Sequence, residues 1–300
     1  MIGIITACVS YFLGGCNNLL DKFVLSKKIR NFLVYAFYID IASIVAVVLA
    51  PFAFYDISVA ELFLYFCVGA AFFGGLTLYY YVLSKEEVTR IAPVIAGFYP
   101  VFILLLNNYF LGQSLRSSEY IAFVLLVAGS MLAVWHKNGV ARSGRILLMA
   151  VAVAGLYAVS DALFKSAFID GRSFVGALFW TKVLAVPLAL LLLIFPRVRR
   201  DVFGVGAKKD HAVERGVLVV MNKVFGGLAS ITYRYALFYG NIAIISAMSG
   251  LQYIFLFLLA VFFSKKYPHL LEEPLTAGIV GQKLASFALI GVGIAVLFLA

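Results

Sequence analysis

Ten long apolar runs limit what this chain can fold into. They cover residues 2–25, 32–54, 60–83, 88–111, 118–136, 145–168, 173–195, 214–238, 242–263 and 275–299, and most of the breaks between them are short. A helix that crosses a bilayer needs about 20 predominantly apolar residues, and the runs have this length. Strands of a membrane barrel are shorter and alternate apolar with polar residues, which these runs do not. The sequence therefore predicts an all-α integral membrane protein with ten transmembrane helices.

The composition agrees with a membrane protein. Of the 300 residues, 64% are hydrophobic and 13% are charged, whereas about a quarter of the residues of a soluble domain are charged. The net charge of +10 would suggest an acidic partner if the protein were soluble. In a membrane protein we interpret the basic excess as a mark of loops kept in the cytoplasm. We expect the lipid bilayer as the surroundings and no nucleic acid as a partner.

The loop charges also predict an orientation. The odd-numbered loops carry nearly all the loop Lys and Arg residues, above all the long basic loop at 196–215. The even-numbered loops carry only Arg116, Lys165 and Arg172. Since cytoplasmic loops are enriched in Lys and Arg, the odd loops should be cytoplasmic. This places both termini outside the plasma (cell inner) membrane.

The two halves of the chain are similar to each other. The segment "RNFLVYAFYID" at 30–40 aligns with "RSFVGALFWTK" at 172–182, and "FFGGL" at 72–76 aligns with "VFGGL" at 224–228. We therefore predict a first five-helix repeat at 1–138 and a second at 139–300. Because each repeat has an odd number of helices, the second repeat starts on the opposite side of the membrane and is inverted relative to the first. Inverted repeats are typical of secondary transporters, which bind their substrate near the midplane.

The sequence lacks the motifs of other function classes. No GxxxxGK[ST] motif for ATP, no HExxH, no GxSxG and no cluster of Cys and His occurs. We therefore expect no enzyme activity, no cofactor and no metal site.

Two segments carry a resemblance to a known family. They are "YYYVLSKEEVTRIAPVIAGFYPVFILLLNNYFLGQSL" at 79–115 and "YRYALFYGNIAIISAMSGLQYIFLFLLAVFFSKK" at 233–266. With these, the chain resembles the drug/metabolite transporter superfamily, EamA-like branch, in which the third span of each half ends in a Tyr-x-x-Ala-Leu-like phrase. Tyr235 to Leu237 fit that phrase well, and Tyr81 and Leu83 fit it loosely. The resemblance implies a transporter of ten helices in two inverted halves. Family members commonly have cytoplasmic termini, whereas the loop charges here predict the reverse.

Five ionisable residues fall well inside the predicted spans: Asp40, Asp161, Lys182, Lys223 and Arg234. Such residues are functional candidates by default. The repeat alignment places Asp40 opposite Lys182, so the two charges could pair across the central axis. One interpretation is an ion pair that only holds the halves together. The other is a proton-coupling carboxylate or a direct contact with a charged substrate.

Lys223 and Arg234 are eleven residues apart, so both lie on one helix face, about 16 Å apart. Such a basic stripe suits a carboxylate, a phosphate or a zwitterion. The alternative is that each reaches one membrane interface. We expect Asp21, Lys22 and Lys283, nearer the ends of runs, to extend to the lipid headgroups. Further candidates for lining a substrate cavity are Asn18, Tyr81, Tyr99, Trp180, Tyr235, Gln252 and Tyr253.

These observations favour a secondary transporter that exports a small polar metabolite, such as an amino acid, by alternating access. Proton coupling is one way to drive it, and the protein would act as a monomer or homodimer. A carrier of lipid-linked compounds or nucleotide sugars is the alternative within the same fold, for which the basic stripe would be the argument. A membrane scaffold without transport is disfavoured, because a scaffold needs no midplane charges.

Overall fold

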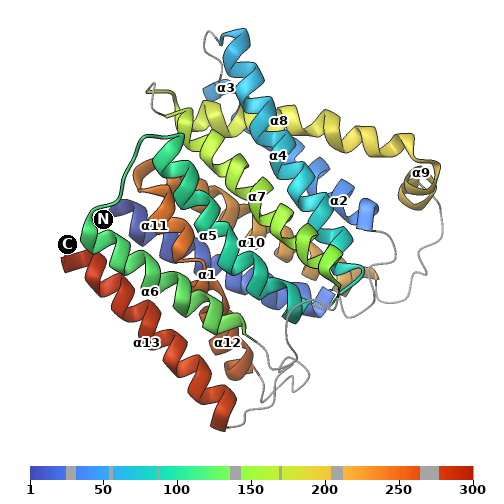
Figure 1. Cartoon of the computed structure of the whole chain (residues 1–300). Coiled ribbons are helices and arrows are strands. Elements are labelled where there is room, and N and C mark those ends of the chain that lie inside the picture. The colour runs from blue at the N-terminus through green and yellow to red at the C-terminus, as the bar shows by residue number, and fades with distance from the viewer. Residues whose placement is uncertain are drawn as a thin grey trace. The chain divides into compact units, whose positions relative to one another are not determined.

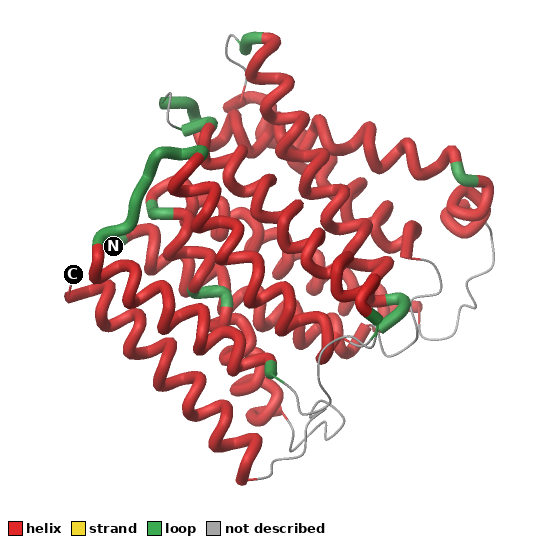
Figure 2. Tube along the Cα trace, in the orientation of Figure 1, coloured by secondary structure: helices red, strands yellow, loops and turns green. Residues whose placement is uncertain are grey.

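The computed structural model describes residues 1–24, 32–53, 57–86, 88–135, 143–168, 171–203, 212–263 and 277–299. All regular structure in these ranges is helical (Figure 2), as the apolar runs predict. The contacts divide the chain into two compact units. The first consists of residues 1–28, 113–139 and 208–300, and the second of residues 29–112 and 140–207. Each unit therefore takes helices from both predicted repeats, and the repeat itself stays a prediction.

The helices follow the apolar runs closely. The first unit contains α1 (Ile2–Val24), α6 (Ser117–Val134), α10 (Ala212–Tyr239), α11 (Ile242–Ala247), α12 (Gly250–Phe263) and α13 (Ala277–Leu299). The second contains α2 (Phe32–Ile41), the 3-10 helix η1 (Ala42–Leu49), α3 (Ala50–Ala53), α4 (Val59–Leu83), α5 (Val88–Tyr109), α7 (Gly144–Ser166), α8 (Phe174–Leu191), the 3-10 helix η2 (Leu192–Ile194) and α9 (Pro196–Phe203).

Nine of the ten predicted spans are helices long and apolar enough to cross a membrane, counted within the described residues. The remaining predicted span, 214–238, coincides with α10. The side chains of residues 212–220, 222 and 223 on this helix lie outside the described part of the chain. The chain is thus a multi-pass helical protein, and the count of ten stays a prediction.

In the first unit, α1 packs against α10 and α12, and α6 packs against α13, as Figure 1 shows for the last pair. The hydroxyl of Ser130 on α6 lies at the break between α11 and α12. It donates a hydrogen bond to the Ala247 carbonyl at 3.0 Å and accepts one from the Gly250 N–H at 2.9 Å. Helix ends leave backbone groups unpaired, and this one hydroxyl satisfies such a group on each side of the break.

Two lysines lie in other places than the sequence suggests. Lys283 does not extend to the headgroups: it is 8% exposed, and its Nζ donates to the Ala133 carbonyl at 2.7 Å. Gln282 next to it donates to the carbonyls of Leu132 and Trp135. Both side chains thus satisfy the carbonyls at the C-terminal end of α6, which a helix alone leaves open. Lys165, counted above with the loop charges, lies in the last turn of α7 and is buried. The side chains of Asp21 and Lys22 lie outside the described residues.

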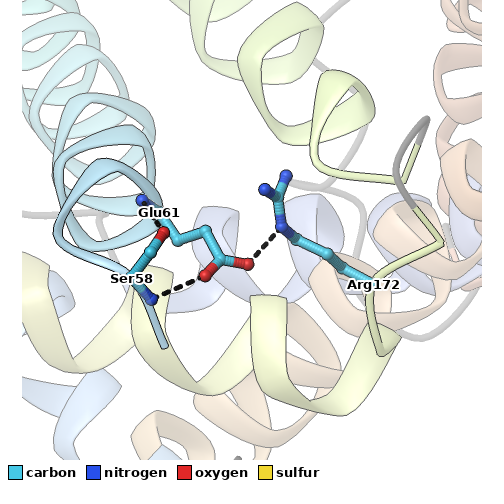
Figure 3. Close-up of polar contacts among 3 residues, drawn as sticks. All are labelled: Ser58, Glu61 and Arg172. Atoms are coloured by element: carbon cyan, nitrogen blue, oxygen red, sulfur yellow. Dashed lines mark hydrogen bonds and ion pairs between the residues drawn. The ribbon is translucent and has the colours of Figure 1, made fainter. Parts of the chain in front are cut away.

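In the second unit, α7 packs against α4 and α5, and α8 packs against α4, α2 and η1. The N-terminus of α4 is fixed by a capping box. The Glu61 N–H donates to the Ser58 hydroxyl at 3.2 Å, and the Ser58 N–H donates to Glu61 Oε2 at 2.7 Å. The other oxygen of Glu61 pairs with Arg172, just before α8 (Figure 3). This ion pair fixes the start of α4 relative to the segment that joins α7 to α8.

Candidate functional site

Charged and phenolic side chains gather inside the second unit from five helices. We call this set the polar cluster. Its members are Asp40 on α2, Tyr79 on α4, Tyr99 on α5, Tyr157 and Asp161 on α7, and Lys182 on α8.

Asp161 and Tyr99 form the first part of the polar cluster. The Tyr99 hydroxyl donates a hydrogen bond of 2.6 Å to Asp161 Oδ2, and Asp161 is 7% exposed. Ser160, one residue earlier, donates to the Val68 carbonyl on α4 at 3.0 Å. That bond fixes the rotation of α7 against α4, so that the neighbouring Asp161 points to α5. A short bond to a carboxylate is of the strong, charge-assisted kind.

Asp40 and Lys182 form the second part. The two lie on helices that contact each other, and they interact electrostatically. Asp40 is 1% exposed, and its Oδ2 has no hydrogen-bond partner among the described residues. Lys182 Nζ lies 5.2 Å from the ring centroid of Phe72 on α4, which is within cation–π range. The repeat alignment predicted that Asp40 and Lys182 occupy matching places, and the structure brings both into one polar cluster.

Tyr157 connects the two parts and was not a candidate from the sequence. It lies within electrostatic range of Asp40, Asp161 and Tyr79. Its ring lies over Gly75, where an added Cβ would be 3.0 Å from the ring carbons. Tyr157 precedes Asp161 by four residues, so both lie on the same face of α7. That spacing is the sequence signal that could have found it.

Tyr81 and Trp180 are the remaining candidates of the second unit. Tyr81 is in the last turn of α4, with its ring 5.3 Å from Phe32 and 5.9 Å from Lys85 Nζ. This position near a helix end agrees with an interfacial aromatic residue. Trp180 stacks edge-on against Phe179 at 5.1 Å and is half-buried.

The other candidates belong to the first unit. Arg234 is 3% exposed on α10, and its neighbour Tyr233 lies 6.1 Å from the ring of Tyr11. Gln252 lies against Gly14, at which an added Cβ would be 2.9 Å from the Gln252 amide carbon. Lys223 lies on α10, and its side chain is outside the described residues. The half-buried members of this set are Asn18, Tyr235, Gln252 and Tyr253.

Comparisons with known proteins support the fold and show a family similarity in the first part of the chain. A solved crystal structure aligns with 99% of this chain and 95% of its own, at 19% sequence identity and a TM-score of 0.69. At that identity the likeness shows a shared fold. No curated protein matches the sequence. Residues 1–135 match the EamA-like transporter family.

The matched part makes up less than half of the 300 residues, so the match is a similarity of this part of the chain. The match agrees with the resemblance drawn from the segment at 79–115, which lies wholly inside it, while the segment at 233–266 lies outside it. It covers α1 to α6 and so includes Asp40, Tyr79 and Tyr99 of the polar cluster. The long apolar helices make the protein a multi-pass membrane protein.

Proposed function

We propose that this EamA-like protein is a secondary transporter that exports a small polar metabolite, an amino acid or a related compound, across the plasma membrane by alternating access. The observation that carries the proposal is the polar cluster. Ionisable groups at membrane depth are costly, and they mark substrate and ion pathways. Here two carboxylates, an ammonium and three phenols from five helices meet within one unit.

The charges of the polar cluster suit a zwitterion. The ammonium of Lys182 complements a substrate carboxylate, and the carboxylate of Asp40 or Asp161 complements a substrate amine. Tyr99 and Tyr157 can donate to or accept from neutral polar groups. The burial of Asp40, with one carboxylate oxygen that no described residue satisfies, also suits a group that takes up a proton during transport.

The helix packing supports alternating access. In the predicted alignment, α4 of the first half corresponds to α10 of the second, and α7 corresponds to α1. Within the second unit α4 packs on α7, and within the first unit α10 packs on α1. One pair of aligned glycines lies at these contacts: Gly74 lies near Leu156 on α7, and Gly226 faces Asn17 on α1. Two like units of this kind are what an inverted-repeat transporter uses for its two conformations.

A carrier of an anionic compound, such as a nucleotide sugar, is the second candidate. It is favoured by Arg234, which is buried on α10 with tyrosines on both sides in the sequence. The Lys223 half of the predicted basic stripe is outside the described residues, so the polar cluster remains the stronger basis.

Tyr99→Phe tests the proposed site. The variant removes the hydroxyl that bonds Asp161, and a hydrogen bond to a charged group contributes about 1.5–3 kcal/mol. We expect the initial rate of transport, measured at equal substrate concentration, to fall at least about tenfold while the protein stays folded. The assay is uptake of metabolites, first selected by a thermal-shift screen of the purified protein, into liposomes that contain it.

Tyr109→Phe is the matched control, since Tyr109 is on the same helix and 87% exposed. It should transport as the wild type does. If Tyr99→Phe transports as fast as Tyr109→Phe, the polar cluster is not the transport site.

A further inference from the structure

A short helix, α9, follows the predicted seventh span where the sequence suggests only a basic loop. Its sequence is PRVRRDVF. One side is anchored in the second unit: Val198 is fully buried among Ala36, Phe37, Ala189 and Leu192, and Val202 packs against the same residues. The Tyr38 hydroxyl also lies 3.5 Å from the Val202 carbonyl. The helix is therefore held on α2 and α8.

The other side of α9 is strongly basic. Arg197, Arg199 and Arg200 are exposed and, together with Pro196, line an open hollow of about 580 Å³. Asp201 is the acidic residue of this helix. Three arginines and one aspartate give this helix a net positive charge.

Exposed apolar side chains flank this basic side. Ile194 and Phe195 precede α9 and are 71% and 54% exposed, and Phe203 ends it at 67% exposed. A short amphipathic helix that carries both arginines and exposed aromatic residues is typical of the boundary between headgroups and acyl chains. Its place directly after a membrane-spanning helix agrees with that depth.

We propose that α9 binds the headgroup of an acidic phospholipid, with the phosphate in the open hollow that the three arginines line. The planar guanidinium group matches two phosphate oxygens at once. The exposed Ile194, Phe195 and Phe203 would lie against the acyl chains of the same lipid. This site is independent of the transport proposal, since none of its residues belongs to the polar cluster.

The test measures lipid binding to the full-length protein. Native mass spectrometry of the purified chain with phosphatidylglycerol or phosphatidylcholine gives the affinity for each lipid. We expect tighter binding of phosphatidylglycerol. Each basic residue near a lipid surface contributes about a fivefold factor, so Arg199→Gln/Arg200→Gln should weaken phosphatidylglycerol binding about 25-fold.

The control is Lys85→Gln/Arg145→Gln, which removes two exposed positive charges of the same unit outside α9. It should change the affinity less than about threefold. An equal loss in both double variants, or equal affinity for the two lipids, would overturn the proposal. If inorganic phosphate at equal concentration displaces the lipid, the hollow binds free anions and the lipid assignment is wrong.

A second, more conservative double variant tests the proposal if the glutamine variant does not fold. Arg199→Lys/Arg200→Lys keeps the charge and removes the planar fork. This variant should bind phosphatidylglycerol with an affinity between those of the wild type and the glutamine variant. Unchanged affinity would show that charge alone acts, without the assigned phosphate contacts.

Discussion

Lys182→Met is expected to stop transport and to destabilise the second unit. The substitution leaves Asp40, which is 1% exposed, without the opposite charge that interacts with it. Lys182 is half-buried, and leaving a buried polar group such as Asp40 without its partner costs about 1–3 kcal/mol. We expect a clear fall in the thermal midpoint of the purified protein, read by intrinsic fluorescence in detergent, together with loss of transport.

The double variant Asp40→Asn/Lys182→Gln decides whether the two charges are coupled. Both charges are then absent, so the folded protein should recover part of its stability relative to Lys182→Met. Losses that simply add in the double-mutant cycle would contradict the pairing. Lys85→Met serves as control, because Lys85 is exposed beyond the end of α4.

The same cycle separates the structural from the functional interpretation. If the pair only holds helices together, the double variant should recover stability and transport in parallel. If Lys182 or Asp40 contacts substrate or carries a proton, stability should return while transport does not. The second result is the one that the polar cluster predicts, because Asp40 and Lys182 lie in the same polar cluster as Asp161.

Gly250→Ala is expected to have the second large effect, on the first unit. A Cβ at this position would lie 2.3 Å from Ser130 Oγ and 2.6 Å from the Ser130 Cα. The second of these is backbone, so the contact cannot be relieved by rotating a side chain. The shift would also disrupt the hydrogen bonds of Ser130 to Ala247 and Gly250. Overpacking costs about 1–3 kcal/mol, and we expect at least the upper part of that range.

Gly291→Ala is the matched control for Gly250→Ala. Gly291 lies in α13 of the same unit, and no atom lies within 4 Å of an added Cβ. Alanine is favoured over glycine within a helix by up to about 1 kcal/mol, so this variant should be as stable as the wild type or more so. Thermal unfolding of both proteins measures the difference. If both variants unfold at the same temperature, the tight contact at Ser130 is wrong.

The sequence predicts the membrane helices well because their cause is local. A span must satisfy its own backbone and be apolar throughout, so length and composition suffice to locate it. The bounds of α1, α4 and α7 agree with the predicted runs within two residues. The break between α11 and α12 includes Ser249, directly before Gly250, but the Ser130 hydroxyl that holds it comes from α6, more than a hundred residues earlier, and cannot be predicted from the local sequence. The helix α9 is missed because its apolar positions, Val198 and Val202, are too few to show a period.

The sequence predicted members of the candidate site only where the alignment of the two halves related one residue to another. The alignment of the halves related Asp40 to Lys182, and the structure places both in the polar cluster. The bond between Tyr99 and Asp161 joins residues 62 positions apart, which a single sequence cannot reveal. Lys283 shows the opposite case: its position near a helix end suggested the lipid interface, but the open carbonyls of α6 are nearer.

The most direct measurement for transport through the polar cluster is counterflow in liposomes that contain the purified protein. The liposomes are loaded with unlabelled metabolite selected by the thermal-shift screen, and the entry of labelled metabolite is followed over time. We expect transient accumulation with the wild type and with Tyr109→Phe, and none with Asp161→Asn. Accumulation by Asp161→Asn at the wild-type rate, or no accumulation by a folded wild-type protein that binds the metabolite, would contradict transport through the polar cluster.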